Sequence, residues 1–249
     1  MIAQRIRYFE VIGTLIRGGA FALVQPWRIS LDDTLGQMRS IGLGALPTAC
    51  LISFTAGYVL ALVLELQLSQ LGRVELVPAL LWIISTEQIV PLGVAFIFVG
   101  RSVSAVSAEL GSMQVSEEIK ALFTMGVDIV SYLLLPRYLA FQIMLPAVTI
   151  VGIYSALLGG WVLCGPVLQM SLSDYTFYVL DGSRLTSVMM AIGKSALFGL
   201  IAATVAFYKG LNVRNGSREI SEATTQSVVL SVVLITVANA IVTTFQLAG

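Results

Sequence analysis

Two charged residues lie inside long apolar stretches, and they are the side chains best placed to do chemistry. Glu87 is the only charge within residues 76–100, and Lys194 is the only charge within residues 185–208. A charge at the centre of a membrane helix costs about 2.5–3.5 kcal/mol on insertion scales, so each should face a partner or a water-filled cavity. We expect Glu87 and Lys194 to pair or to line a polar spot on a pathway; a purely structural ion pair is the alternative.

Other groups that support catalysis or metal binding are scarce. Histidine is absent, which excludes a histidine-based acid, base or metal site. Cys50 and Cys164 each lie in an apolar stretch and form no paired motif, so we interpret them as buried thiols. Gly193-Lys194-Ser195 resembles the end of a phosphate-binding loop, but Val188 stands where that motif needs glycine. The sequence therefore predicts no catalytic residue, no metal site and no cofactor bound by this chain.

The composition is that of a membrane protein. Apolar residues make up 57% of the 249 positions and charged residues 11%, with a mean hydropathy of +0.91, whereas soluble domains are about a quarter charged. Lys and Arg balance Asp and Glu, so charge gives no reason to expect a nucleic-acid partner. A spanning helix needs roughly 20 mostly apolar residues. Five such runs occur and predict an all-α integral membrane protein: 41–64, 75–101, 138–173, 185–208 and 223–249.

The third run is the hardest to interpret. As one straight helix it would be about 54 Å long, too long for one perpendicular crossing and too short for two. We expect it to kink or end at Pro146, at Gly159-Gly160 or at Pro166. Small residues also recur every fourth position, which we interpret as close helix packing; the two series are Gly152, Ala156, Gly160 and Ala202, Ala206, Gly210.

The positions of Lys and Arg predict the orientation. Eleven of the thirteen cations that lie between the runs fall before the first run, between the second and third, or between the fourth and fifth. Because cytoplasmic segments retain positive charge, the N-terminus is predicted to be cytoplasmic and the C-terminus to lie on the outer side.

Residues 1–40 form a separate region that is too polar to span. Ile6, Phe9, Ile12 and Leu15 recur at helical spacing, interrupted by charges such as Glu10. This pattern predicts an amphipathic helix in the membrane interface; a cytoplasmic helix packed on the bundle is the alternative. Residues 41–249 then form one transmembrane domain.

The segment between the second and third runs is polar yet patterned as helix. Val115, Ile119, Leu122 and Phe123 fall on one apolar face, while neighbouring charges lie off it. Ser116 can cap the start of this helix and Gly126 suits its end. The apolar face must be buried against this chain's own bundle or against a partner, and the residues alone leave both open.

The same segment carries a family resemblance. Val99-Gly100-Arg101, residues 107–113, residues 116–119, Met125-Gly126 and Pro136-Arg137 follow the order and spacing of signatures in MlaE-type (YrbE-type) permeases. Leu66-Gln67 and Ala223-Thr224-Thr225 extend the resemblance over most of the chain. Two departures occur. Residues 86–91 keep Glu87 and Pro91 but lack the arginine and glycine of the family's R-E-L-G-P, and Gln226 stands where arginine is common.

The resemblance implies the membrane subunit of an ABC transporter that moves phospholipid or a similar lipid in the bacterial inner membrane. It implies a second copy of this chain, a cytoplasmic ATPase dimer that binds ATP and Mg²⁺, and an MCE-domain protein on the outer side. Residues of the polar segment would then contact the ATPase through a coupling helix, and four others would contribute to the substrate pathway. The coupling candidates are Glu109, Gly111, Met113, Glu117, Glu118, Ile119, Leu122, Met125 and Gly126; the pathway candidates are Glu87, Lys194, Pro91 and Gln67.

Two rival functions come from other classes. In a secondary transporter or channel, Glu87 and Lys194 would form an ion or proton relay within one polypeptide. The five runs without an internal repeat argue against it. In a membrane scaffold without transport, both charges could be replaced without functional loss.

Overall fold

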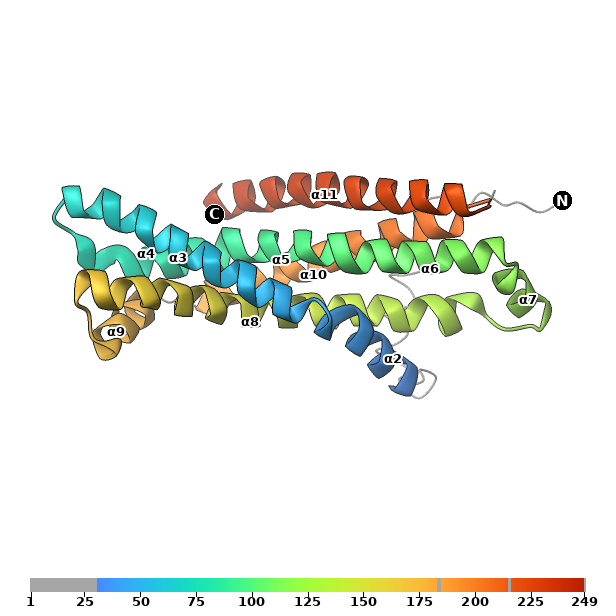
Figure 1. The fold of residues 1–249 in the computed structure, drawn as a ribbon, viewed down its shortest axis with the longest axis horizontal. Helices are drawn as coiled ribbons and strands as arrows, with labels where there is room; N and C mark the ends of the chain where they lie inside the picture. The colour runs from blue at the N-terminus through green and yellow to red at the C-terminus, as the bar shows by residue number, and fades with distance from the viewer. Residues whose placement is uncertain (1–30, 183–184, 215, 249) are drawn as a thin grey trace. The chain divides into compact units, whose positions relative to one another are not determined.

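The computed structural model describes residues 31–182, 185–214 and 216–248 as helices joined by short turns (Figure 1). No strand occurs in this part of the chain, which confirms the predicted all-α fold. The α-helices are α2 (Leu31–Met38), α3 (Leu46–Gln70), α4 (Val77–Ile84), α5 (Val90–Phe98), α6 (Ser104–Val115), α7 (Glu118–Thr124), α8 (Leu135–Leu168), α9 (Leu172–Gly182), α10 (Leu185–Leu211) and α11 (Gly216–Ala248). A 3-10 turn, η3 (Val74–Leu76), and four π-helical turns accompany them: η2 (Arg39–Leu43), η4 (Ser85–Ile89), η5 (Val99–Val103) and η6 (Val130–Leu134).

Five helical stretches are long and apolar enough to cross a membrane, as the sequence predicts. Spans 1 to 5 are Asp33–Gln70, Val74–Val115, Val130–Leu168, Leu185–Leu211 and Gly216–Gln246. The amphipathic helix predicted around Ile6 to Leu15 lies outside the described residues, and the described part of that region begins with α2. The assignment of 41–249 to one domain stays a prediction.

The third span shows at which of the expected positions the helix ends. Helix α8 continues through Pro146 and through Gly159-Gly160, and it ends at Leu168, two residues after Pro166. The helix therefore does not end at the first proline or at the glycine pair. Membrane helices tolerate such breakers when neighbouring groups satisfy the freed backbone, and here the glycine pair has a packing role instead.

Two of the π-helical turns precede prolines. η4 ends two residues before Pro91, and η6 ends two residues before Pro136. Proline has no N–H, so the carbonyl four residues earlier loses its α-helical partner. These carbonyls belong to Glu87 and Tyr132. The prolines thus leave a main-chain acceptor available in each of spans 2 and 3.

The helices pack into two compact units. Unit 1 comprises the described residues of Met1–Ala45, Phe98–Leu145 and Leu197–Gly249; unit 2 comprises Leu46–Ile97 and Pro146–Ala196. In unit 1, α11 lies alongside α6 (Figure 1), and the hydroxyls of Ser107 and Ser227 lie 2.8 Å apart. A Cβ at Gly210 would be 2.9 Å from the Ser107 carbonyl oxygen. The small series of span 4 is therefore packed, as predicted, with Ala202 and Ala206 fully buried.

In unit 2, α3 and α8 approach backbone to backbone. A Cβ at Gly57 would overlap the main-chain carbonyl of Ala156, and a Cβ at Gly159 would overlap that of Phe54. The Ser155 hydroxyl donates to the Cys50 carbonyl oxygen at 2.8 Å. Such close approach is how small residues stabilise helix pairs in lipid, where dispersion contacts replace the hydrophobic effect.

Gly57→Ala is expected to lower the free energy of unfolding by about 1–3 kcal/mol, because overpacking at a backbone contact forces the helices apart. Thermal unfolding in detergent, followed by size-exclusion chromatography, measures the change. Gly93→Ala is the matched control, since a Cβ at Gly93 has nothing within 4 Å. Equal unfolding midpoints in the two variants would contradict the close contact.

Candidate functional site

The turn from α6 into α7 is fixed by its backbone. Glu117 has a left-handed φ of 59° and precedes α7, and Gly126 follows the helix with a φ of 77°. The amide of Val127 donates to the Leu122 carbonyl at 3.1 Å, and that of Gly126 donates to Phe123 at 3.1 Å. These two bonds form a Schellman motif, for which glycine is the preferred residue. The predicted end of the helix at Gly126 is confirmed.

The predicted start is wrong in one detail. Glu117, rather than Ser116, occupies the position before the first helical residue, and no side-chain bond caps the helix there. The Ser116 hydroxyl instead donates to the Glu118 carboxylate at 2.8 Å. Because the chain reverses through the left-handed Glu117, the Ser116 side chain cannot reach the first free amides of α7.

The apolar residues of this segment do not share one environment. Ile119 is buried within unit 1, whereas Phe123 is 71% exposed and Met125 is 68% exposed. Glu117 and Lys120 form an exposed ion pair at 3.2 Å beside them. We call Phe123 and Met125 the α7 surface. Phe123 lies on α7 and Met125 directly follows it, and exposed apolar side chains beside a charged pair form a surface that a partner can cover.

Three coupling candidates lie on α6 and contact other parts of unit 1. Glu109 accepts a hydrogen bond from Arg137 at 2.7 Å. Gly111 lies under Val213 and Ile220, whose side chains a Cβ would meet at 3.2 and 3.5 Å. Met113 is partly buried. Their role at an ATPase stays a prediction, and the α7 surface is the more exposed part of the segment.

The Glu109–Arg137 pair links the two helices on either side of α7. Arg137 is 4% exposed, and its second Nη donates to the Leu133 carbonyl at 2.9 Å. Glu109 lies before α7 and Arg137 after it, so the pair holds the base of the α6–α7 segment. The sequence analysis identified the motifs that contain Glu109 and Arg137 but did not predict that the two side chains pair. Opposite charges 28 residues apart show no helical periodicity.

Glu109→Gln is expected to lower the free energy of unfolding by about 1–2 kcal/mol, since it leaves the buried Arg137 without its counter-charge. Glu117→Gln is the control, and it should change stability by less than about 0.5 kcal/mol because that ion pair is exposed. Thermal melting of the two variants in the same detergent makes the comparison. If Glu109→Gln has the same melting temperature as the wild type, the Glu109–Arg137 pair does not stabilise the protein.

The two charges inside the spans come together in unit 2. The Lys194 ammonium donates to the main-chain oxygen of Glu87 at 2.9 Å, and the Ser187 hydroxyl donates to the Glu87 carboxylate at 2.7 Å. Lys194 is 2% exposed. Pro91 explains why the Glu87 carbonyl can accept this bond, since it removes the amide that would otherwise bond it. Lys194 and Glu87 are therefore in contact, and this hydrogen bond joins the ammonium to a backbone oxygen. A role of either residue in a substrate pathway stays a prediction.

The fourth pathway candidate does not join this cluster. Gln67 is exposed on α3 and hydrogen-bonds to none of these residues. Ser85 and Thr86, which precede Glu87, are buried, and within the described chain their hydroxyls have no partner. Sequence reasoning assigned these two hydroxyls no role, although four consecutive polar residues, Ser85 to Gln88, in an apolar span were a usable signal. The hydrogen bonds of the cluster join span 2 to span 4.

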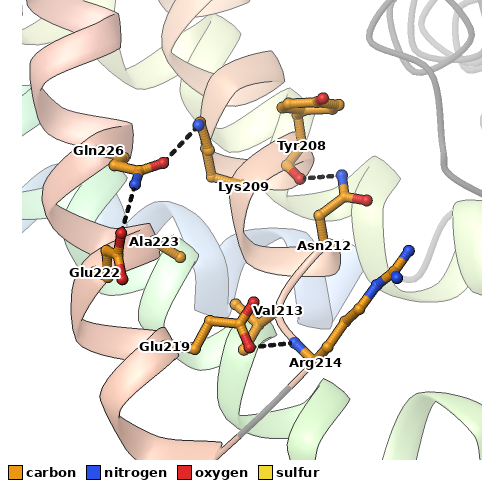
Figure 2. Close-up of a pocket in the computed structure, with 9 residues that line it drawn as sticks. All are labelled: Tyr208, Lys209, Asn212, Val213, Arg214, Glu219, Glu222, Ala223 and Gln226. Carbon is orange, nitrogen blue, oxygen red and sulfur yellow. Dashed lines mark hydrogen bonds between the residues drawn. The ribbon is translucent and has the colours of Figure 1, made fainter.

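A polar pocket of about 530 Å³ lies where α10 turns into α11 (Figure 2). Lys209 donates to Gln226 at 2.8 Å, Gln226 donates to Glu222 at 3.1 Å, and the Arg214 amide donates to Glu219 at 3.0 Å. Its polar groups therefore bond one another across the turn. We interpret the pocket as a structural feature of the α10–α11 turn, whose two sides these hydrogen bonds join. In the sequence, four charged residues precede Ala223-Thr224-Thr225. Because each motif was interpreted separately, the sequence analysis did not predict that these residues line one pocket.

A second pocket of about 420 Å³ lies in unit 2 and is almost wholly apolar. The Tyr175 hydroxyl at its wall donates to the Leu157 carbonyl at 2.8 Å. Burial, with a smaller contribution from Cys164, raises the pKa of Tyr175, so the phenol remains a donor at neutral pH. The lining residues come from α4, α8 and α9: Trp82, Tyr154, Leu157, Leu158, Trp161, Leu172, Tyr175, Thr176, Val179 and Leu180.

Comparison with known proteins decides the family. The family description Permease MlaE matches residues 34–245. The chain belongs to the MlaE permease family. This permease is 28% identical over 229 residues to the probable ABC transporter permease protein slr1045 of Synechocystis, covering 92% of this chain and 87% of that protein.

Two further relatives extend the comparison. A probable ABC transporter permease protein of Rickettsia typhi, RT0041, is 28% identical over 222 residues, covering 89% of this chain and 85% of that protein. The chloroplastic protein Trigalactosyldiacylglycerol 1 of Arabidopsis thaliana is 26% identical over 235 residues, covering 94% of this chain and 67% of that protein. The chain is thus a multi-pass membrane subunit of ABC-transporter type.

Proposed function

We propose that this permease moves phospholipid or a similar lipid, and that a separate cytoplasmic ATPase supplies the energy. The family match over residues 34–245 supports the transporter part of the proposal. The Arabidopsis relative is named after a galactolipid, which supports a lipid as cargo. The mostly apolar spans are consistent with such a cargo.

The α7 surface carries the proposal of an ATPase partner. Phe123 and Met125 are more than two-thirds exposed, while the helix that holds them is fixed by Gly126 and by the Glu109–Arg137 pair at its base. A rigid helix with an exposed aromatic anchor is suited to insertion in a groove of a partner. ATP binding would pull the two α7 helices of a permease dimer together and so change access to a lipid-sized cavity between the copies.

The remaining parts of the assembly follow from family and charge. We propose an inner-membrane homodimer with its N-terminus in the cytoplasm, because eleven of thirteen cations between the runs lie on that side. An MCE-domain protein would exchange lipid with the dimer on the outer side.

Purification of the tagged permease from its native membrane in mild detergent tests the proposal. Mass spectrometry of the retained proteins and lipids should find an ABC ATPase, an MCE-domain protein and a phospholipid. A folded permease that elutes without an ATPase would instead favour a self-sufficient transporter. A complete complex that retains no lipid, and whose ATPase activity no lipid stimulates, would overturn the lipid cargo alone.

A further inference from the structure

Arg101 lies at the boundary between the apolar part of span 2 and its polar extension. It is the first charge after Glu87 in that span, and fourteen helical residues separate it from the end of α6 at Val115. A cation that directly follows a hydrophobic run is placed at the level of the lipid headgroups. The residue is exposed, whereas its neighbours Ser102 and Val103 are buried. Its side chain therefore leaves the bundle where hydrocarbon ends.

A glycine shapes the position of the guanidinium. A Cβ at Gly44 would overlap Arg101 Nη2 and lie close to its Cζ, so the guanidinium rests on the bare backbone of Gly44. The Ser102 hydroxyl donates to the Ile41 carbonyl at 2.9 Å and joins η5 to η2 at the same place. Two π-helical turns and one buried hydrogen bond thus hold the arginine and the glycine together.

The charge of Arg101 is not neutralised within the described chain. No carboxylate or carbonyl of these residues accepts a hydrogen bond from its guanidinium, in contrast to the buried and paired Arg137. Leu43, beside Gly44, is 53% exposed. An exposed apolar side chain next to an unneutralised guanidinium fits an amphiphile with an anionic group. The planar fork of arginine matches phosphate oxygens in a bidentate manner.

We propose that Arg101, seated on Gly44, binds the phosphate group of a membrane lipid. An ATPase docked on the α7 surface is a poor alternative, because fourteen helical residues correspond to about 21 Å along the helix axis. The site does not depend on which molecule is transported, and a lipid held there would anchor the junction of spans 1 and 2 in the bilayer interface.

The test compares two ways of losing the site. Arg101→Gln removes the charge. Gly44→Ala keeps the charge but displaces the guanidinium, and the fold can tolerate it because the overlapping atoms belong to the end of a flexible side chain. Gly100→Ala is the matched control, since a Cβ there has nothing within 4 Å. Size-exclusion profiles and melting temperatures confirm that each full-length variant is folded.

Native mass spectrometry of the delipidated permease, titrated with phosphatidylglycerol, measures the affinity. We expect a loss of about tenfold or more in Arg101→Gln and Gly44→Ala, and little change in Gly100→Ala. Diacylglycerol, which lacks the phosphate, should not distinguish the variants. Equal phosphatidylglycerol affinity in the wild type and the three variants would overturn the proposal.

Two other outcomes would assign the site differently. Displacement of the lipid by millimolar inorganic phosphate would assign the site to free phosphate. Dissociation of a dimer in Arg101→Gln would assign the arginine to contact with a second copy. None of these readings requires an ATPase or transport.

Discussion

Phe123→Asp is expected to separate this permease from its ATPase while leaving it inserted and folded. Phe123 is 71% exposed, so the substitution removes little internal packing. An aromatic anchor in a partner's groove contributes at least about 2 kcal/mol, so the substitution should weaken association more than about 30-fold. Co-purification of the ATPase and lipid-stimulated ATP hydrolysis provide the two measurements.

Phe177→Asp is the matched control for this experiment. Phe177 is 65% exposed on α9, which joins spans 3 and 4, whereas α7 joins spans 2 and 3. Because one predicted span separates them, we expect the two connections on opposite sides of the membrane. A cytoplasmic ATPase can therefore respond to only one of the two substitutions. Loss of the ATPase in Phe177→Asp, with retention in Phe123→Asp, would reverse the proposed orientation.

A third variant separates the surface from the geometry that presents it. Gly126→Ala leaves Phe123 and Met125 unchanged but places a side chain at a φ of 77°, where non-glycine residues are disfavoured. We expect ATPase association to weaken less than in Phe123→Asp, because the anchor remains while its helix ends less regularly. An effect as large as that of Phe123→Asp would show that the turn itself is the contact.

Hydropathy predicted the spans well because membrane insertion depends on local composition. Five runs free of charge, or nearly so, were sufficient to place five helices, and Gly126 was sufficient to end α7. The course of α8 through Pro146 was not predictable in this way. Whether a proline ends a membrane helix depends on neighbours that satisfy the freed carbonyl, and those neighbours come from distant parts of the sequence.

In the candidate site, too, the sequence predicted which residues matter but not which atoms they contact. The cost of an isolated membrane charge predicted that Glu87 and Lys194 would associate. The atom that Lys194 contacts depended on Pro91, whose missing amide makes the Glu87 carbonyl available. The Glu109–Arg137 pair, the seat of Arg101 on Gly44 and the bonded α10–α11 turn each join residues with no shared periodicity. Their types were visible in the sequence, but their partners required the fold.

Lys194→Met should lower the free energy of unfolding by about 1.5–3 kcal/mol, the range for a lost hydrogen bond that involves a charged group. The methionine fills a similar volume, so packing changes little, but the Glu87 carbonyl loses its donor and the carboxylate loses a nearby positive charge. Unfolding in graded SDS mixtures measures the loss. Val188→Ala is a control for general sensitivity of span 4, because it changes no charge.

The double substitution Glu87→Gln with Lys194→Met distinguishes the two contributions. Glutamine removes the negative charge that Lys194→Met leaves without its nearby ammonium, and it can still accept a hydrogen bond from Ser187, which donates to the Glu87 side chain at 2.7 Å. The double variant should therefore recover part of the stability lost in Lys194→Met, giving a coupling energy of about 1–3 kcal/mol in the double-mutant cycle. Strict additivity would mean that the side-chain charges do not interact and that the ammonium bonds only the Glu87 carbonyl.

Transport by the double variant then decides the role of the cluster. If the cluster is only a polar tie between helices, transport should recover together with stability. If Glu87 or Lys194 is a pathway residue, transport should stay lost although stability has been restored.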